Sequence, residues 1–407
     1  MIRTSRASTD GYLRRHKPDN VLLLVTGLLL LLGAVVAYTI SPALEQSSII
    51  YRQLGHFGLA ALAFTVAANL PIDFWRKIHF PLLIAAIGVS LLLLIPSISL
   101  EVNGATRWLN LGLLSFQPAE FLKFASVIYL AAWLSERIRT NRLNDKRETM
   151  WPLIIITGGV GLLIAVLQKD LGTMVAMVGI FLSMLFVSGI KLGLFSRYVG
   201  AIAAAAVAGT VLFPHRVSRL LTFFDPARDV DGASYHINQA LIAVGSGGWF
   251  GRGLGKSVQV FGYLPEAVND SIFAIVAEQF GFIGSILVLF LYGALAVRLL
   301  RIVERAPNDY MKLIVAGIFG WLMSHVLINI GAMLGVIPLT GITLPFLSLG
   351  GTSLVFISAA FGLAFNISRY ASLAYAKKEK PSRHAHLAGR RGDSGTRFAA
   401  SFSRPRT

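Results

Sequence analysis

Residues 271–298 read SIFAIVAEQFGFIGSILVLFLYGALAVR, a long apolar run with one internal carboxylate, Glu278. A membrane-spanning helix needs about 20 mostly apolar residues, so this run predicts a helix that crosses a bilayer. A charged group at the centre of such a helix costs roughly 2.5–3.5 kcal/mol. We therefore expect Glu278 to be paired or protonated, and we treat it as a candidate functional residue.

Similar apolar runs recur along the whole chain. Hydrophobic residues make up 55% of the 407 residues and charged residues only 14%, against roughly 25% charged in soluble proteins. The runs predict an all-α integral membrane protein with about ten transmembrane helices. We place these near residues 20–40, 50–70, 79–98, 118–134, 151–168, 171–190, 196–213, 271–298, 313–335 and 350–371. The chain has no cysteine, which excludes disulfides and thiolate metal sites.

The basic residues are distributed unevenly between the two sides of the membrane. Most of the 37 Lys and Arg residues lie in the two terminal segments and in connections on the same side as these segments. The positive-inside rule then places both termini in the cytoplasm. The net charge of +17 thus reflects topology and attraction to membrane lipids, and does not indicate nucleic-acid binding. The expected organisation is a cytoplasmic tail at 1–19, a transmembrane domain at 20–371, and a basic, disordered cytoplasmic tail at 372–407.

Two connections on the opposite, extracytoplasmic side are longer than the rest. Residues 100–117 join the third and fourth spans, and residues 214–270 join the seventh and eighth. Long loops on a rigid scaffold usually carry function, so the second loop is where we expect the active chemistry.

The end of that loop, FGYLPEAVND at 261–270, contains two carboxylates, Glu266 and Asp270. Asp270 opens the span, where a carboxylate can cap the helix and interact with its dipole. It can equally act as a general base or a cation-binding group at the membrane face. Glu266 is either a solvated loop charge or part of the same site. Glu278 lies eight residues beyond Asp270, about 12 Å deeper along the helix.

The fourth span carries Glu120 and Lys123, three residues apart and preceded by Gln117. This spacing puts both on one face of a helix, where they can form an ion pair. Alternatively, they form the polar wall of a water-filled cavity that opens to the outside.

Several cations lie on the outer side, where the positive-inside rule predicts few. They suggest an anionic ligand such as a phosphate, which suits the geometry of arginine. The alternative is that some of them pair with Asp225, Asp229 and Asp231. These cations are Arg107, Arg216, Arg219, Arg228, Arg252 and Lys256.

Glycine is concentrated at 245–255, GSGGWFGRGLG. The composition is that of a phosphate-binding loop, but the flanking strand and helix of a nucleotide fold are missing. Close backbone packing, with Trp249 at the membrane interface, is the simpler interpretation. A second small-residue stretch, GITLPFLSLGGTS at 341–353, predicts re-entrant or unwound backbone that lines a cavity or is buried in protein.

Four motifs in order resemble the SEDS family (shape, elongation, division and sporulation), which includes RodA and FtsW. The resemblance spans residues 20–371 and is closer to the division-type FtsW branch. The motifs are NGATRW (103–108) with LSFQPAEFLK (114–123), QKDLGT (168–173), GSGGWFGRGLGKSVQ (245–259) with YLPEAVNDSIFAIVAEQFG (263–281), and NIGAMLGVIPLTGITLPFLSLGGTS (329–353).

The resemblance implies a peptidoglycan glycosyltransferase of the bacterial cytoplasmic membrane. It would polymerise lipid II at the outer face and release undecaprenyl diphosphate. Its partners would be a class B penicillin-binding protein and other division or elongation proteins. By the same resemblance Asp270 is the catalytic candidate, Glu120 and Lys123 line a central cavity, and Arg107 lies near it.

Further candidates for substrate binding or for the cavity are Arg219, Lys256, Glu266 and Glu278. The diphosphate would be held by cations such as Arg107, Lys123 or Arg219, and a divalent cation such as magnesium is a candidate cofactor. We expect Glu278 to be a paired wall residue and Glu266 a support of the loop.

The sequence departs from the family pattern beside the catalytic candidate. Val268 and Asn269 stand where the family commonly has His-Thr, and Gln279-Phe280 stand where it has Glu-Leu. Two other functions fit the same features: a transporter that flips lipid II, and a non-catalytic scaffold of the division complex.

Overall fold

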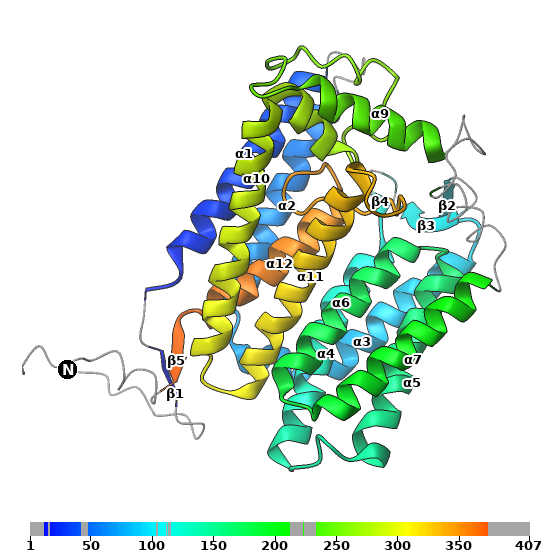
Figure 1. The fold of residues 1–407 in the computed structure, drawn as a ribbon. Helices are drawn as coiled ribbons and strands as arrows, with labels where there is room; N and C mark the ends of the chain where they lie inside the picture. Colours follow the sequence, from blue (N-terminus) through cyan, green and yellow to red (C-terminus); the bar gives the residue numbers. More distant parts are fainter. Residues whose placement is uncertain are drawn as a thin grey trace, which may run out of the picture.

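The computed structural model describes residues 12–14, 17–41, 48–102, 105–110, 112, 115–211, 223 and 233–372. Figure 1 shows a bundle of long helices, with one short helix and a small sheet at one end. Arg219, like Arg216 and Arg228, lies outside the described residues, as do Asp225, Asp229 and Asp231 and nearly all of both terminal tails.

Each of the ten expected apolar segments overlaps a helix. Six helical segments of the described chain are long and apolar enough to cross a membrane: α1, α3, α5 with its flanking turns, α6, α10 and α11. The ten helices are α1 (Asn20–Ile40), α2 (Ser48–Asn69), α3 (Ile72–Leu91), α4 (Pro118–Arg139), α5 (Trp151–Leu162), α6 (Leu171–Ser188), α7 (Leu192–Val211), α10 (Ile272–Arg305), α11 (Asp309–Met333) and α12 (Gly351–Ile367).

Polar side chains fix where several helices begin. Asp19 accepts a hydrogen bond from the backbone N–H of Leu22 at the start of α1, and Asn308 accepts one from Met311 at the start of α11. Such caps satisfy backbone donors that a helix leaves without partners. Asp19 also forms an ion pair with Arg298 of α10 at 2.5 Å, which ties the beginning of α1 to the neighbouring helix.

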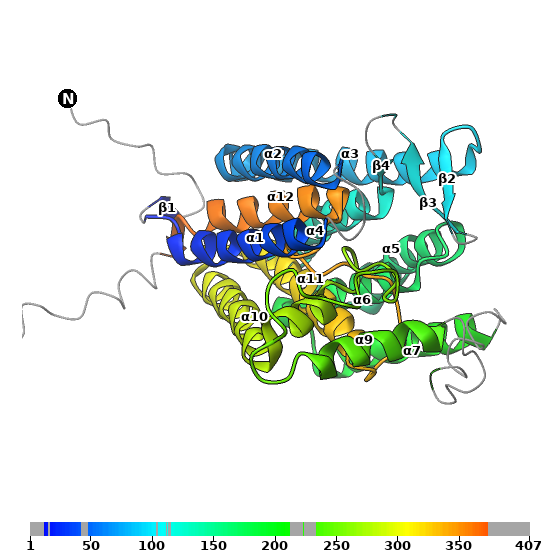
Figure 2. The same ribbon diagram turned by 90° about the horizontal axis from the view of Figure 1, so that it is seen from above.

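The most buried of the candidate spans is α11, with 78% of its apolar window inside the protein. It packs against α6, α10 and α4, and α12 packs against α2. Seen from above, α11 lies in the middle of the bundle (Figure 2). Small residues permit close approach, because a methyl group on Gly320 would lie 2.7 Å from the carbonyl oxygen of Gly179.

The secondary structure of the described chain is helical apart from two small sheets. Within the expected connection at 100–117 lies a three-stranded antiparallel sheet, formed by β2 (Ser99–Val102), β3 (Ala105–Asn110) and β4 (Ser115–Phe116). Strand β1 (Tyr12–Arg14) pairs with β5 (Tyr370–Ser372) at the opposite end of the bundle. The pairing of segments far apart in the sequence is decided by tertiary contacts, so local patterns do not reveal it.

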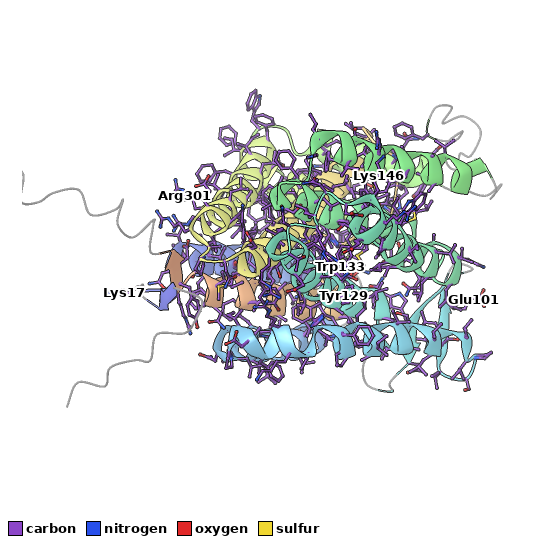
Figure 3. All side chains as sticks on the ribbon, turned by 90° about the horizontal axis from the view of Figure 1, so that it is seen from below. Lys17, Glu101, Tyr129, Trp133, Lys146 and Arg301 are labelled. Carbon is purple, nitrogen blue, oxygen red and sulfur yellow. The ribbon has the colours of Figure 1, made fainter. Side chains whose placement is uncertain are left out.

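The two ends of the bundle differ in character. One end carries the short helix α9 (Ala233–Ser246) and the sheet β2–β4, and we call it the α9 end (Figure 1). The other carries the β1–β5 pair. Figure 3 is seen from the β1–β5 side and labels the basic residues Lys17, Lys146 and Arg301.

Helix α10 is interrupted at Gly281, where φ is 69° and ψ is −163°. The sequence predicted one continuous span, so this break is a correction. Backbone groups of the glycine-rich loop (residues 247–258) replace the hydrogen bonds that the break removes. Arg252 N–H donates to the Glu278 carbonyl at 2.9 Å, and Phe282 N–H donates to the Gly248 carbonyl at 2.8 Å. A broken helix is tolerated where protein satisfies its freed backbone groups.

The glycine-rich loop lies directly on the backbone of the half-helix before the break. A methyl group on Gly247 or Gly251 would collide with the carbonyl oxygens of Ala277 or Gln279. Close backbone packing, the simpler interpretation of this stretch, is thus confirmed. Trp249, which we expect at the membrane interface, is 68% exposed on the protein surface.

Residues 338–350 (the 338–350 segment) connect α11 to α12 without helical structure. Leu344, Phe346 and Leu347 are buried, and the hydroxyl of Tyr292 donates to the Pro345 carbonyl at 2.6 Å. The prediction of unwound backbone buried in protein is confirmed, and this segment brings the polar residues of the interior together.

Candidate active site

Asp270 lies in a tight turn, Pro265–Ser271 (the 265–271 turn), which contacts α9 through Ser271 and His236. It is 8% exposed, and its Oδ1 atom is buried without a hydrogen-bond partner in the described part of the chain. The side-chain amide of Asn329, on α11, donates to the backbone carbonyls of both Asp270 and Ile342 at 2.7 Å. The 265–271 turn, α11 and the 338–350 segment therefore meet at this carboxylate.

Burial and the nearby charge of Glu266 raise the pKa of Asp270 from its usual value to about 7, although the backbone N–H groups of Asp270 and Ser271 oppose the shift. A carboxyl group with this pKa exchanges protons readily near neutral pH, as a general base must. The N-cap of α10 is Ser271, so Asp270 is not the capping residue. The capping interpretation of Asp270 is therefore wrong, and its chemical role stays a prediction.

Glu266 supports the turn that carries Asp270. Its φ is +50°, a conformation uncommon for residues other than glycine, and its carbonyl accepts the N–H groups of Asn269 and Ser271. Its carboxylate accepts a hydrogen bond of 2.6 Å from the Asn269 side chain. Asn269 and Val268, which depart from the family pattern, thus have structural partners, since the Val268 carbonyl accepts the Leu349 N–H at 3.0 Å.

Glu278 is fully buried and paired, as expected, but its partners come from the glycine-rich loop. Its carboxylate accepts hydrogen bonds from the Val258 N–H at 2.8 Å and from the Ser257 hydroxyl, and Arg252 lies 3.6 Å away. The carboxylate therefore fastens the loop to the half-helix. Its position along the sequence did not indicate this role.

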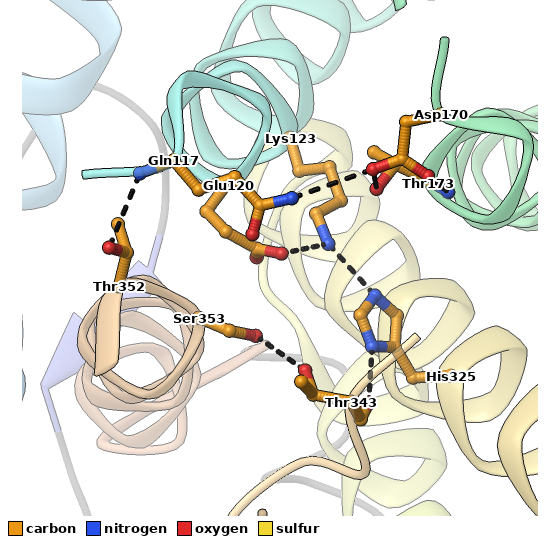
Figure 4. Close-up of polar contacts among 9 residues, drawn as sticks. All are labelled: Gln117, Glu120, Lys123, Asp170, Thr173, His325, Thr343, Thr352 and Ser353. Carbon is orange, nitrogen blue, oxygen red and sulfur yellow. Dashed lines mark hydrogen bonds and ion pairs between the residues drawn. The ribbon is translucent and has the colours of Figure 1, made fainter. Parts of the chain in front are cut away.

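The predicted ion pair between Lys123 and Glu120 is confirmed, at 2.8 Å between buried side chains. The Lys123 ammonium also lies 2.9 Å from Nε2 of His325, on α11, and 5.0 Å from the ring centroid of Trp321. Since the ammonium donates to Nε2, the N–H at Nδ1 of His325 donates to the Thr343 carbonyl at 3.0 Å. Figure 4 shows this chain of contacts from α4 through α11 to the 338–350 segment.

Asp170 joins the polar network from α6. Its carboxylate caps α6 by accepting the N–H and the hydroxyl of Thr173, and it accepts a 3.5 Å bond from the side chain of Gln117 (Figure 4). Arg107, on β3, donates to the carbonyls of Gln168 and Lys169 at 3.3 and 2.8 Å. The QKDLGT motif is thereby held between the sheet and α4.

Several buried polar atoms in this region have no hydrogen-bond partner among the residues that the structure describes. Buried polar groups are normally paired, so atoms of this kind mark a place for water or a polar ligand. They are Glu120 Oε2, both amide atoms of Gln168, Asp270 Oδ1, Asn329 Oδ1 and Thr340 Oγ1.

Of the outer cations in the described residues, Lys256 is exposed on the glycine-rich loop, while Arg107 and Arg252 bind protein groups. The described part of the chain contains no group of three His, Cys, Asp or Glu residues that could hold a metal ion. A magnesium ion bound by protein groups alone therefore does not fit the described residues.

Sequence reasoning missed three polar residues, His236, His325 and Asn329. His236 lies on α9, and His325 and Asn329 lie on α11, and their positions along the sequence do not reveal which groups of other elements they contact. The only available signal was the cost of placing polar groups in an apolar span.

The sequence matches the family of FtsW, RodA and SpoVE cell cycle proteins over residues 19–373. It is 38% identical over 364 residues to the stage V sporulation protein E of Bacillus subtilis, covering 88% of this chain and 98% of that protein. It is 36% identical over 390 residues to a probable peptidoglycan glycosyltransferase FtsW of a Thioalkalivibrio species, covering 93% of this chain and 96% of that protein.

Solved structures agree with these matches. One, described as the structural coordination of polymerization and crosslinking by a peptidoglycan synthase complex, superposes with a TM-score of 0.69 and 28% identity, covering 86% of this chain and 98% of the other. The rod shape determining protein RodA of Thermus thermophilus superposes with a TM-score of 0.63 and 27% identity, covering 86% and 97%. With apolar helices, sequence motifs and fold in agreement, this multi-pass membrane protein belongs to the FtsW/RodA/SpoVE (SEDS) family of cell cycle proteins.

Proposed function

We propose that this chain is a peptidoglycan glycosyltransferase that polymerises lipid II, with Asp270 as its general base. Relatives named as probable peptidoglycan glycosyltransferases support the reaction class. The observation that carries the assignment of Asp270 is a buried carboxylate with an unpartnered oxygen and a pKa near 7. It lies where three elements, the 265–271 turn, α11 and the 338–350 segment, converge.

The reaction is a single displacement. The sugar 4-hydroxyl of an acceptor lipid II attacks C1 of the donor chain's terminal MurNAc while Asp270 removes the hydroxyl proton. The bond between C1 and the diphosphate oxygen breaks, and undecaprenyl diphosphate leaves with its electron pair. Such a displacement inverts the configuration at C1, as in inverting glycosidases.

Cations near the α9 end receive the diphosphate. Lys256 is exposed on the loop that packs against the half-helix after Asp270. Among the described residues, Arg107 donates hydrogen bonds through Nε and Nη2, which leaves Nη1 for a ligand. The other two candidates are Lys123 and, outside the described residues, Arg219. Within the protein, the Lys123 ammonium contacts the carboxylate of Glu120 at 2.8 Å.

The ten helices span the bacterial cytoplasmic membrane, with both termini in the cytoplasm and α9 outside. The basic residues at the β1–β5 end support this orientation (Figure 3). Asp270 precedes the apolar part of α10, so it lies at the level of the outer head groups, where the diphosphate of lipid II is found.

The partner is a class B penicillin-binding protein, which crosslinks the glycan strands. A related structure described as coordinating polymerization and crosslinking supports this pairing. The FtsW names of many relatives favour a role in the division complex rather than in elongation.

The test is polymerisation of fluorescent lipid II by the purified full-length chain, with and without the partner. Asp270→Asn should abolish glycan formation. Asp309→Asn, an exposed aspartate at the start of α11 near the other end, is the matched control and should leave it unchanged. Wild-type activity in Asp270→Asn would remove Asp270 from the mechanism, and a flippase or scaffold would form no glycan at all.

A further inference from the structure

Helix α9 places a histidine against the turn that carries Asp270. Nε2 of His236 lies 2.7 Å from the hydroxyl oxygen of Ser271, and the same hydroxyl lies 2.8 Å from the carbonyl oxygen of Pro265. The mechanism above uses neither His236 nor Ser271. Ser271 follows Asp270 directly in the chain, and His236 contacts Asp270's neighbour through the Ser271 hydroxyl.

The chemistry of the groups fixes the direction of both hydrogen bonds. A carbonyl oxygen can only accept, so the Ser271 hydroxyl must donate to Pro265. The hydroxyl oxygen is then the acceptor for His236, which must carry its proton on Nε2. Burial lowers the pKa of His236, against the opposing effect of the Glu266 charge, so the ring is neutral near pH 7 and Nδ1 bears the lone pair.

The bond from Ser271 to Pro265 links the two ends of the turn, and the bond from His236 to Ser271 attaches them to α9. Pro265 opens the turn and Ser271 closes it, and the Ser271 side chain is fully buried. Ser271 makes no side-chain cap to α10, since its hydroxyl is committed to Pro265. Loss of His236 would leave a buried hydroxyl oxygen without its donor, and buried unsatisfied groups are costly.

The backbone bonds of the turn do not reach α9. The Glu266 carbonyl accepts the N–H groups of Asn269 and Ser271, and Asn329 of α11 holds the Asp270 carbonyl. Backbone and α11 thus set the shape of the turn, while the His236–Ser271–Pro265 chain sets its position against α9.

We propose that His236 is a positioning residue for Asp270, acting through the hydroxyl of Ser271 to hold the 265–271 turn in the geometry that proton removal requires. The proposal rests on the proposed function in its assignment of Asp270 as the base. The hydrogen-bond chain itself can be tested without any activity.

The first measurement is steady-state polymerisation of lipid II by the full-length chain. His236→Ala should lower kcat by about tenfold, the effect of leaving a buried group unsatisfied, and should change KM little, because the turn acts in the chemical step. His236→Gln retains an N–H near the position of Nε2 and should restore most of kcat. His236→Ala with Ser271→Ala should be no worse than either single change, since both break one chain.

The second measurement is hydrogen–deuterium exchange of the peptide that covers the turn. His236→Ala should accelerate exchange of the Asn269 and Ser271 amides, and His236→Gln should not. His79→Ala is the matched control, because His79 is also part-buried on a helix and bonds a carbonyl, that of Arg76 on α3. It should leave exchange in the turn unchanged.

The outcomes separate the two ideas. If Asp270→Asn is inactive while His236→Ala keeps wild-type kcat and exchange, the positioning role is refuted and the proposed function stands. If Gln and Ala at 236 are equally impaired, the hydrogen bond is not the reason and the proposal also fails. If Asp270→Asn is fully active, the assignment of Asp270 as the base fails, and with it the proposal that His236 positions that base; the exchange data then show only whether His236 holds the turn.

Discussion

The raised pKa of Asp270 predicts an acid limb in the pH dependence of polymerisation. With a pKa of about 7, about one-tenth of the carboxyl groups are ionised at pH 6 and about nine-tenths at pH 8. Only the ionised form can accept the proton. At pH values well below the pKa of Asp270, kcat should therefore fall by about tenfold for each pH unit. A carboxyl group at its usual pKa of 3.8 would give a flat profile over this range.

Replacing Glu266 tests the cause of the shift. Burial is the larger contribution and the Glu266 charge the second. Glu266→Gln removes the charge yet retains an oxygen that can accept the bond from Asn269. We therefore expect the acid limb to move to lower pH while staying above the range of an exposed aspartate.

The assay is the initial rate of lipid II polymerisation at saturating substrate between pH 5 and 9, at constant ionic strength. Glu304→Gln, an exposed glutamate near the β1–β5 end of α10, is the matched control and should leave the limb in place. A profile that is flat between pH 6 and 8, or a limb that Glu266→Gln does not move, would refute this account of Asp270.

Two further predictions concern stability and are checked by thermal unfolding in detergent. Lys123→Met should destabilise the protein by about 3–5 kcal/mol, because it leaves the Glu120 charge buried without its partner; adding Glu120→Gln should recover much of the loss, and a double variant as unstable as the single would contradict this reasoning. Gly281→Ala should cost about 1–3 kcal/mol from its backbone conformation, with a further cost because the methyl group would lie 2.7 Å from the backbone of Trp249. Gly293→Ala, a helical position with open space, should be neutral or stabilising, and equal losses at the two glycines would rule out the close contact as the cause.

Local patterns predicted much of this protein because their causes are local. Helix positions follow from the length of apolar runs, and the Lys123–Glu120 pair follows from a spacing of three residues within one helix. The concentration of glycine at 245–255 predicted close backbone packing. The structure shows the reason, because a side chain on Gly247 or Gly251 would collide with the carbonyls of Ala277 and Gln279. The break at Gly281 was missed, since the hydrogen bonds that make it tolerable come from residues 248–253, about thirty positions earlier in the chain.

The sequence by itself determined that the chain is a multi-pass helical membrane protein, the family to which it belongs, and Asp270 as the residue to test. Hydrophobic runs and motifs carry that information because both are contiguous in the chain. Only the tertiary structure decided which polar groups meet: Asn329 at the backbone of Asp270, His325 at Lys123, and His236 at Ser271. These partners lie on different helices, and their pairing depends on how the helices pack, which no local pattern specifies.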